Sequence, residues 1–206
     1  MRVISGSARG RKLREPAGND IRPTSDMVKE SIFDIIQFDI EGRRVLDLFA
    51  GTGQLGIEAL SRGAGHVTFV DSKQEAVKLI WENLKICGFT GLASVHTCDA
   101  LKYLGRNDPV IGDQDAINDH VFDAWPRPGR RRVEKYDLIF LDPPYNTPLL
   151  GRALVKIMEF DKLNTNGIIM CEAKADSVAP DAAPPYCFQK QYKYGSVKIM
   201  RYERGQ

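Results

Sequence analysis

The chain has 206 residues, a length typical of one domain that can bury a substantial core. Hydrophobic residues make up 43% and charged residues 27% of it, and the net charge is only +2, as in ordinary soluble proteins. No apolar run approaches the roughly 20 residues that cross a membrane, and the start lacks the apolar core of a signal peptide. We therefore expect a single cytoplasmic domain over residues 1–206, without membrane contact.

The cysteines give no sign of a metal site or a disulfide framework. They show no C-x-x-C spacing and no clustering with histidine, and they are Cys87, Cys98, Cys171 and Cys187. This pattern predicts reduced thiols and no bound metal.

Basic side chains are concentrated near the start of the chain. Residues 1–25 contain Arg2, Arg9, Arg11, Lys12, Arg14 and Arg22 against Glu15 and Asp20. We expect residues 1–20 to form a basic β-hairpin extension, with strands over 2–5 and 11–15 around a glycine-containing turn. Clustered basic groups indicate a polyanionic partner, so Arg9, Arg11, Lys12 and Arg22 are candidate RNA contacts. The basic residues near the C-terminus are interpreted as a solvated surface.

A helix is predicted after Pro23. Thr24, Ser25 or Asp26 can cap its start. Its core face is formed by apolar side chains at helical spacing, namely Val28, Ile32, Ile35 and Ile36.

Residues 45–56 predict a strand, a G-x-G-x-x-G loop and the start of a helix. Such glycines allow a tight turn and the close approach of the backbone to a ligand, and Gly56 would let the helix lie close to the strand. Phe49, Gly51 and Gly53 are therefore candidate cofactor contacts. The next strand, over 67–71, ends in Asp71, an acid that suits the hydroxyls of a ribose.

Asp47 distinguishes between two nucleotide-derived cofactors that use such loops. It ends the strand just before the glycines. A nicotinamide dinucleotide would place an anionic pyrophosphate beside this carboxylate, which would repel it. The sulfonium and amino groups of S-adenosylmethionine would be attracted, so the pattern favours the methyl donor.

A third strand is predicted from residue 93 and ends in Asp99, which Ala100 follows. The carboxylate of Asp99 could accept a hydrogen bond from the amine of an adenine, and the N–H of Ala100 could serve its ring. Four successive strands thus end in acids, and ligands bind at such carboxyl ends in open α/β sheets.

The fourth of these strands, over residues 137–141, runs into Asp142-Pro143-Pro144-Tyr145. The prolines stop the strand and stiffen the backbone that follows it. Asp142 and the carbonyl of Pro143 could accept hydrogen bonds from an NH2 group while Tyr145 stacks on the ring that carries it. A strand followed by a rigid turn would explain the same residues without any ligand.

The remaining elements alternate between helix and strand. Helices are predicted over 73–87 and 148–160, a strand over 168–172 after Asn166-Gly167, and a terminal hairpin over 188–202. This alternation predicts an α/β fold with a doubly wound, mostly parallel sheet. Residues 105–135 are rich in charge, proline and glycine and are expected to form a mobile insertion. We hypothesise an added RNA contact from residues 125–132.

Several motifs together resemble a known family. The segments RVISGSARGRKL, IRPTSDMVKESIFDII and LDLFAGTGQLGIEALSRGA, with the later LDPPY, resemble the bacterial RsmD family. The resemblance implies a seven-stranded, Rossmann-like class I methyltransferase fold that binds S-adenosylmethionine, with Thr24 near the methionine end. It further implies methylation of N2 of a guanine in small-subunit (16S) ribosomal RNA, guanine 966, within an assembled or partly assembled 30S particle.

Other functions share parts of this pattern. A DNA methyltransferase acting on adenine N6 or cytosine N4 would carry the same acid-Pro-Pro-aromatic element, although such enzymes usually need a sizeable target-recognition domain. A protein-glutamine methyltransferase would more often have Asn in place of Asp142. A non-catalytic RNA-binding assembly factor could use the fold as a scaffold. We expect a monomer.

Overall fold

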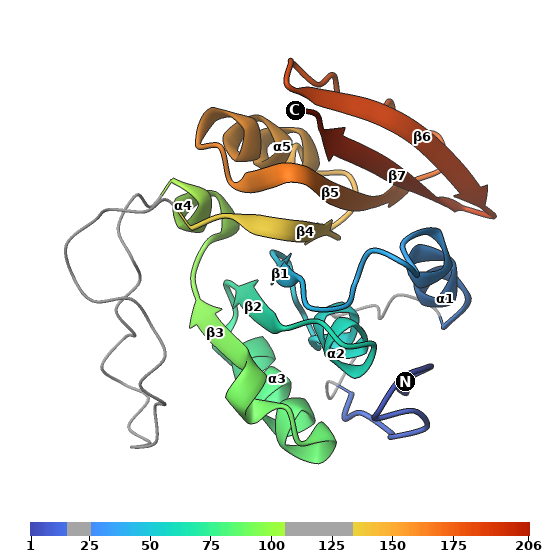
Figure 1. Ribbon diagram of the computed structural model, residues 1–206, viewed down its shortest axis with the longest axis vertical. Helices are drawn as coiled ribbons and strands as arrows, with labels where there is room; N and C mark the ends of the chain where they lie inside the picture. The colour runs from blue at the N-terminus through green and yellow to red at the C-terminus, as the bar shows by residue number, and fades with distance from the viewer. Residues whose placement is uncertain (16–25, 106–133) are drawn as a thin grey trace.

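The computed structural model describes residues 1–15, 26–105 and 134–206 of the chain. It confirms the predicted α/β class, with one seven-stranded sheet in the order β3-β2-β1-β4-β5-β7-β6 (Figure 1). The strands are β1 (Arg44–Asp47), β2 (His66–Asp71), β3 (Ala93–Thr97), β4 (Tyr136–Leu141), β5 (Leu163–Lys174), β6 (Tyr186–Tyr194) and β7 (Val197–Arg204). The helices are α1 (Asp26–Ile35), α2 (Gln54–Ser61), α3 (Gln74–Cys87), the 3-10 turn η1 (Thr90–Leu92), α4 (Ala100–Leu104) and α5 (Leu149–Glu159).

The direction of the strands brings their carboxyl ends to one edge of the sheet. Strands β3, β2, β1, β4 and β5 are parallel, and β7 lies antiparallel between β5 and β6. Asp47 at the end of β1 is in register with Phe69 of β2 and Phe140 of β4. Asp71 and Asp142 therefore lie two residues further along their strands than Asp47, at the same edge.

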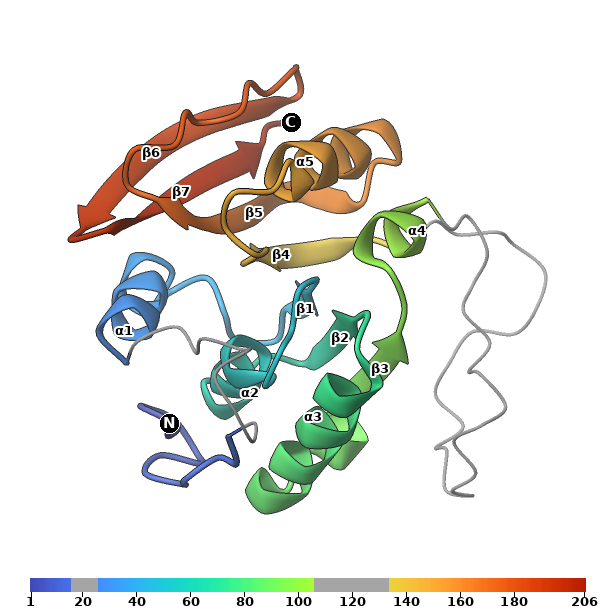
Figure 2. The ribbon, with the colours of Figure 1, turned by 180° about the vertical axis from the view of Figure 1, so that it is seen from behind.

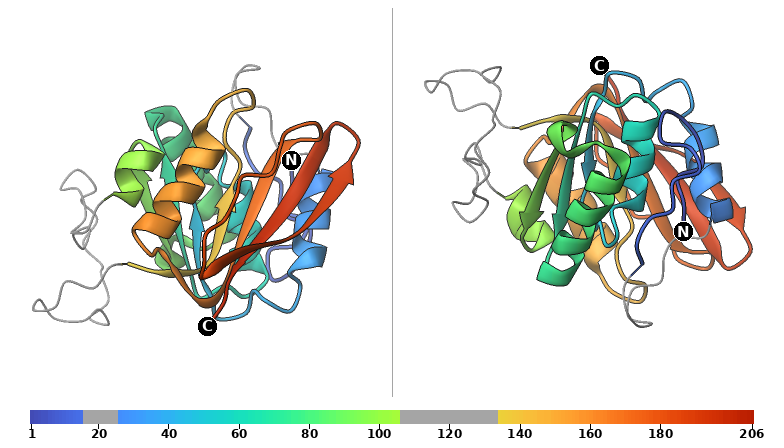
Figure 3. Two further views of the ribbon diagram at one scale, coloured as in Figure 1. Left: turned by 90° about the horizontal axis from the view of Figure 1, so that it is seen from above. Right: turned by 90° about the horizontal axis from the view of Figure 1, so that it is seen from below.

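Helices cover both faces of the sheet, as a doubly wound fold requires (Figures 2 and 3). One face packs against α1, α2 and α3 through side chains such as Val45, Leu138 and Phe140. The other packs against α4 and α5 through the alternating residues, including Leu46 and Ile139. Burial on both faces explains why the central strands β1 and β4 are mostly apolar.

The start of β5 was predicted too late. The strand begins at Leu163, so Asn166 and Gly167 lie inside it instead of preceding it. Its pairing with β4 shifts between Tyr136 and Leu138, and Asn166 has a positive φ of 60° within this irregularity. Turn-forming residues at this point produce a bulge, which bends the strand without ending it.

The two arms of the N-terminal segment pair antiparallel over a short length. Arg2 and Lys12 form a bridge, and the N–H groups of Val3 and Leu13 donate to the carbonyls of Arg11 and Met1 at 3.0 and 3.2 Å. The first arm also binds α2 through its backbone. The N–H groups of Ile4 and Ser5 donate to the carboxylate of Glu58 at 2.7 and 2.9 Å. The segment is thus docked on the body of the domain.

Among the described residues, no helix combines the length and apolar character that a membrane crossing demands.

Gly56 is predicted to be necessary for close packing of α2 on the sheet. A Cβ added there would lie 2.2 Å from Cε1 of Phe69 and 2.8 Å from Cγ1 of Val67. We expect Gly56→Ala to lower the free energy of unfolding by about 1–3 kcal/mol, as overpacked cores do. Urea denaturation measures this change. Gly151→Ala is the control because a Cβ there meets nothing within 4 Å, and equal stability losses in both variants would contradict the prediction.

Candidate active site at the carboxyl edge of the sheet

The loop between β1 and α2 forms the centre of this edge. Gly51 and Gly53 both have a positive φ, of 53° and 76°, which lets the backbone turn directly from the strand into the helix. The N–H of Gly51 donates to Asp71 Oδ2 at 2.9 Å, and the N–H of Lys73 donates to Asp71 Oδ1 at 2.9 Å. Asp71 therefore fixes the glycine loop against the end of β2.

Asp47 is buried beneath the same loop. The N–H of Gly56 donates to its Oδ2 at 3.0 Å. Burial raises the pKa of Asp47 to about 7, and the negative charge of Asp71 adds to this effect while the bond from Gly56 opposes it. A carboxyl with a pKa near 7 is only partly ionised at neutral pH, and a cation bound beside it increases the ionised fraction.

Asp99 caps a helix and does not end a strand. Strand β3 ends at Thr97, two residues earlier than predicted, and Asp99 caps α4 by accepting a bond from the N–H of Lys102 at 2.9 Å. Its side chain is exposed, whereas Ala100 is buried. A carboxylate has further lone pairs, so capping is compatible with a second hydrogen bond to a ligand.

The residues after β4 stand at the same edge. Asp142 and Tyr145 are half-buried, Pro143 is buried, and Phe49 is half-buried beside the glycine loop. The β1–β4 boundary, where Asp47 and Asp142 end neighbouring strands, is the point at which the strand order reverses. Crevices that bind ligands form at such switch points.

Two residues outside the predicted set take part in the site. Glu172 of β5 is buried and accepts a hydrogen bond from the hydroxyl of Tyr145. The sequence signal for Glu172 was an acid at the end of one more apolar strand. Asn83 of α3 is also buried, and its signal was a polar residue among the apolar positions of a helix.

Asn83 connects the glycine loop to the N-terminal segment. Its Nδ2 donates to the carbonyl of Thr52 at 3.0 Å and to that of Arg14 at 3.2 Å. Its Oδ1 accepts from the N–H of Arg14 at 2.7 Å. One buried amide thus fixes the position of both segments.

The predicted RNA-binding residues that the structure describes are exposed on the N-terminal segment. Arg9, Arg11 and Lys12 all face solvent, and Arg11 donates to the carbonyl of Ile86 at 3.1 Å. Arg22, Thr24 and nearly all of the 105–135 insertion lie outside the described residues. Within the described ranges, no cluster of histidine, cysteine and acidic side chains is arranged to hold a metal ion.

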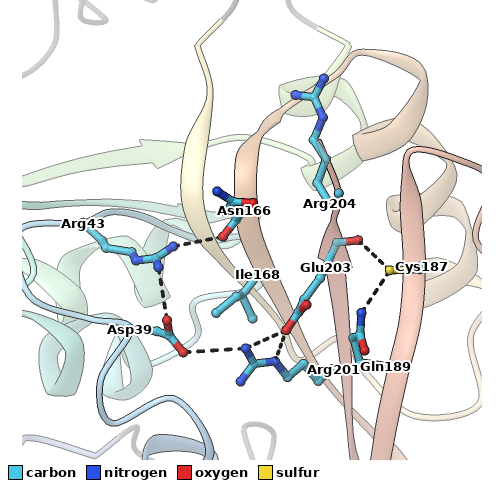
Figure 4. Close-up of a pocket in the computed structure, with 10 residues that line it drawn as sticks. Asp39, Arg43, Asn166, Ile168, Cys187, Gln189, Arg201, Glu203 and Arg204 are labelled. Atoms are coloured by element: carbon cyan, nitrogen blue, oxygen red, sulfur yellow. Dashed lines mark hydrogen bonds and ion pairs between the residues drawn. The ribbon is translucent and has the colours of Figure 1, made fainter.

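A surface hollow at the opposite edge is lined by ion pairs (Figure 4). Arg43 pairs with Asp39 at 3.2 Å, and Arg201 pairs with Glu203 at 2.6 Å and with Asp39 at 3.6 Å. These contacts tie the α1–β1 connection to β7. We assign them to stability, because each charge is already engaged by a neighbour within the protein.

The sheet order, with β7 antiparallel between β5 and β6, and the glycine loop at its switch point define a class I methyltransferase fold. Residues 1–117 and 99–203 match the family model described as "Conserved hypothetical protein 95". The chain belongs to this family, the RsmD family of methyltransferases.

Individual relatives agree with this assignment. The chain is 37% identical over 204 residues to a Bacillus subtilis protein provisionally named rRNA methyltransferase YlbH, covering 99% of both chains. It is 32% identical over 176 residues to ribosomal RNA small subunit methyltransferase D of Haemophilus influenzae, covering 85% of this chain and 80% of the relative. A solved Escherichia coli structure, provisionally named methyltransferase YhhF, superposes with a TM-score of 0.80 at 25% identity, covering 100% and 98% of the two chains.

Asp47 predicts a pH-dependent affinity for S-adenosylmethionine. Because its pKa is about 7 before binding, a cationic ligand that favours the ionised carboxylate should release a proton. We expect the affinity to rise as the pH increases from about 6 to 8. Calorimetry in buffers of different ionisation enthalpy counts the released proton. Asp47→Asn should weaken binding and remove the pH dependence, whereas Asp34→Asn, an exposed site on α1, should change neither. A wild-type affinity independent of pH would contradict this role.

Asn83→Ala should loosen the glycine loop and the N-terminal segment together. Removing the amide leaves the carbonyl of Thr52 and both backbone groups of Arg14 without this partner. We expect the free energy of unfolding to fall by about 1–3 kcal/mol and the affinity for S-adenosylmethionine to decrease. Lys85→Ala, exposed on the same helix, is the control. The link would be disproved if cofactor affinity were unchanged in a destabilised Asn83→Ala variant.

Proposed function

We propose that this protein transfers a methyl group from S-adenosylmethionine to the exocyclic N2 amine of a guanine in small-subunit ribosomal RNA. The observation that carries the proposal is the position of Asp142, Pro143 and Tyr145 directly after β4, beside the glycine loop. The names of the relatives, which include small subunit methyltransferases, support an rRNA substrate.

The residues around the loop fit the proposed cofactor. We assign its contacts to Thr24, Asp47, Phe49, Gly51, Gly53, Asp71, Asp99 and Ala100. Asp71 is held by two backbone N–H groups in an orientation that leaves lone pairs for ribose hydroxyls. Asp47 supplies a buried carboxyl for the cationic end, and a pyrophosphate in its place would be repelled. S-Adenosylmethionine supplies an electrophilic methyl group on a positively charged sulfur.

The chain's own residues would act on the guanine amine. The lone pair of N2 is delocalised into the ring, which makes the amine a poor nucleophile. Hydrogen bonds from the NH2 group to the Asp142 carboxylate and the Pro143 carbonyl would localise that lone pair and stabilise positive charge on nitrogen. Tyr145 would stack on the base, which must leave its helix or stack to enter the site. Alignment of the reacting atoms would contribute much of the acceleration.

We assign RNA binding to Arg9, Arg11, Lys12 and Arg22, and the substrate to a 30S particle, assembled or partly assembled. The first three are exposed on the docked N-terminal segment, where they could contact phosphates without moving the site. A segment fixed in this way would hold a folded RNA in one orientation relative to Asp142. We propose that the enzyme acts as a monomer.

Asp142→Ala is expected to retain affinity for S-adenosylmethionine and to lose at least about 100-fold in turnover, since it removes a group that stabilises developing charge. Single-turnover methyl transfer measures the rate, and calorimetry measures cofactor binding. Asp34→Ala, a change of the same kind at an exposed position of α1, should leave both values unchanged. A near-normal rate in Asp142→Ala would refute the catalytic assignment.

The substrate is tested by transfer of labelled methyl to 30S particles, naked small-subunit RNA and duplex DNA that all lack prior modification. Nucleoside analysis of the product should give N2-methylguanosine on the particles. Methylated adenine or cytosine in DNA would instead identify a DNA methyltransferase. No label on any substrate despite tight cofactor binding would indicate a non-catalytic assembly factor.

A further inference from the structure

Glu172 lies beside the proposed catalytic acid in the sheet. Leu141 of β4 is in register with Cys171 of β5, and Asp142 and Glu172 are the residues that follow. Neighbouring strands are roughly 5 Å apart, so the two backbones are adjacent at the carboxyl edge. The hydroxyl of Tyr145 donates to Glu172 Oε1, which links Glu172 to the ring proposed to stack on the base.

The two acids also share a face of the sheet. Phe140 and Met170 are in register and both belong to the core layer beneath α1, α2 and α3. Because side chains alternate along a strand, Glu172, two residues after Met170, belongs to that same layer, and strand alternation continued one residue past β4 would place Asp142 there as well. A base whose amine meets Asp142 would therefore present its neighbouring ring atoms to Glu172.

Anchoring Tyr145 does not by itself require a carboxylate. One hydroxyl needs one acceptor oxygen, which a neutral glutamine would provide without the cost of burying a charge. Glu172 is only 6% exposed, and its side chain when ionised offers about four acceptor positions. A carboxylate at this position can accept from Tyr145 and from a donor on a ligand at the same time.

We propose that Glu172 accepts a hydrogen bond from N1–H of the target guanine and thereby selects guanine over the other amino-bearing bases. This inference rests on the proposed function. In guanine the amine adjoins a ring nitrogen that carries a hydrogen, so two carboxylates can bind the adjacent N–H groups. In adenine and cytosine the amine adjoins a ring nitrogen with a lone pair, which the Glu172 carboxylate repels. N1 keeps its hydrogen during methyl transfer. The hydrogen bond from N1–H to Glu172 strengthens as positive charge develops on N2.

The test compares RNA that carries guanine or 2-aminopurine at the modified position. Both bases have the N2 amine, but N1 of 2-aminopurine carries a lone pair in place of a hydrogen. We expect wild-type protein to prefer guanine by about 10- to 100-fold in single-turnover rate, the range for one hydrogen bond to a buried charge. Glu172→Gln should reduce this preference to a few-fold, because the amide can accept from Tyr145 and donate to N1.

Two further variants separate base selection from support of Tyr145. Tyr145→Phe removes the tether but keeps Glu172, so it should lower the rate on both bases and preserve the preference for guanine. Glu159→Gln, an exposed site at the end of α5, should change neither quantity. Melting temperature and affinity for S-adenosylmethionine establish that each variant is folded.

Each outcome decides the assignment. An unchanged preference in Glu172→Gln, or an equal loss of preference in Tyr145→Phe, would overturn it. A folded Glu172→Gln that is inactive on both bases would also overturn it, because loss of one N1 contact accounts for no more than about 100-fold. If wild-type protein methylates another base or none, the proposed function fails instead, and that result is visible before any variant is made.

Discussion

The common direction of five neighbouring strands is the constraint on which the rest of the structure depends. Because β3, β2, β1, β4 and β5 are parallel, every one of them delivers its last residue to the same edge. Four acids from segments far apart in the chain lie at one edge only for this reason, namely Asp71, Asp47, Asp142 and Glu172. Helices packed on both faces keep the strands parallel and leave that edge open to ligands.

Buried carboxylates then organise the backbone around the site. Asp47 accepts from the N–H of Gly56, Glu58 accepts from those of Ile4 and Ser5, and Glu172 accepts from the hydroxyl of Tyr145. The three acids thus hold the first turn of α2, the N-terminal segment and an aromatic ring, respectively. Burial makes such groups costly to leave unpaired, so the arrangements are well defined. Hydrogen bonds to these carboxylates therefore position the elements around the site as much as apolar packing does.

Much of the fold and part of the site could be predicted from local signals. The glycines after Asp47 and the prolines after Asp142 mark strand ends through backbone chemistry that acts within a few residues. The contact between Tyr145 and Glu172 could not be predicted, because it depends on which strands are neighbours. Asn83 was missed because its partners, Thr52 and Arg14, are distant in sequence. The contacts of Ile4 and Ser5 with Glu58 could not be predicted either, because α2 is distant from them in sequence.

Because β7 lies between β5 and β6, the sheet cannot finish folding until β7 has been synthesised. Both neighbouring strands are synthesised before β7. Until it emerges from the ribosome, β6 has no neighbour and one side of β5 stays open. Unpaired strand edges of this kind favour association between chains. A nascent chain of this protein is therefore exposed to aggregation for as long as β7 has not joined the sheet, although the parallel part of the sheet has already been made.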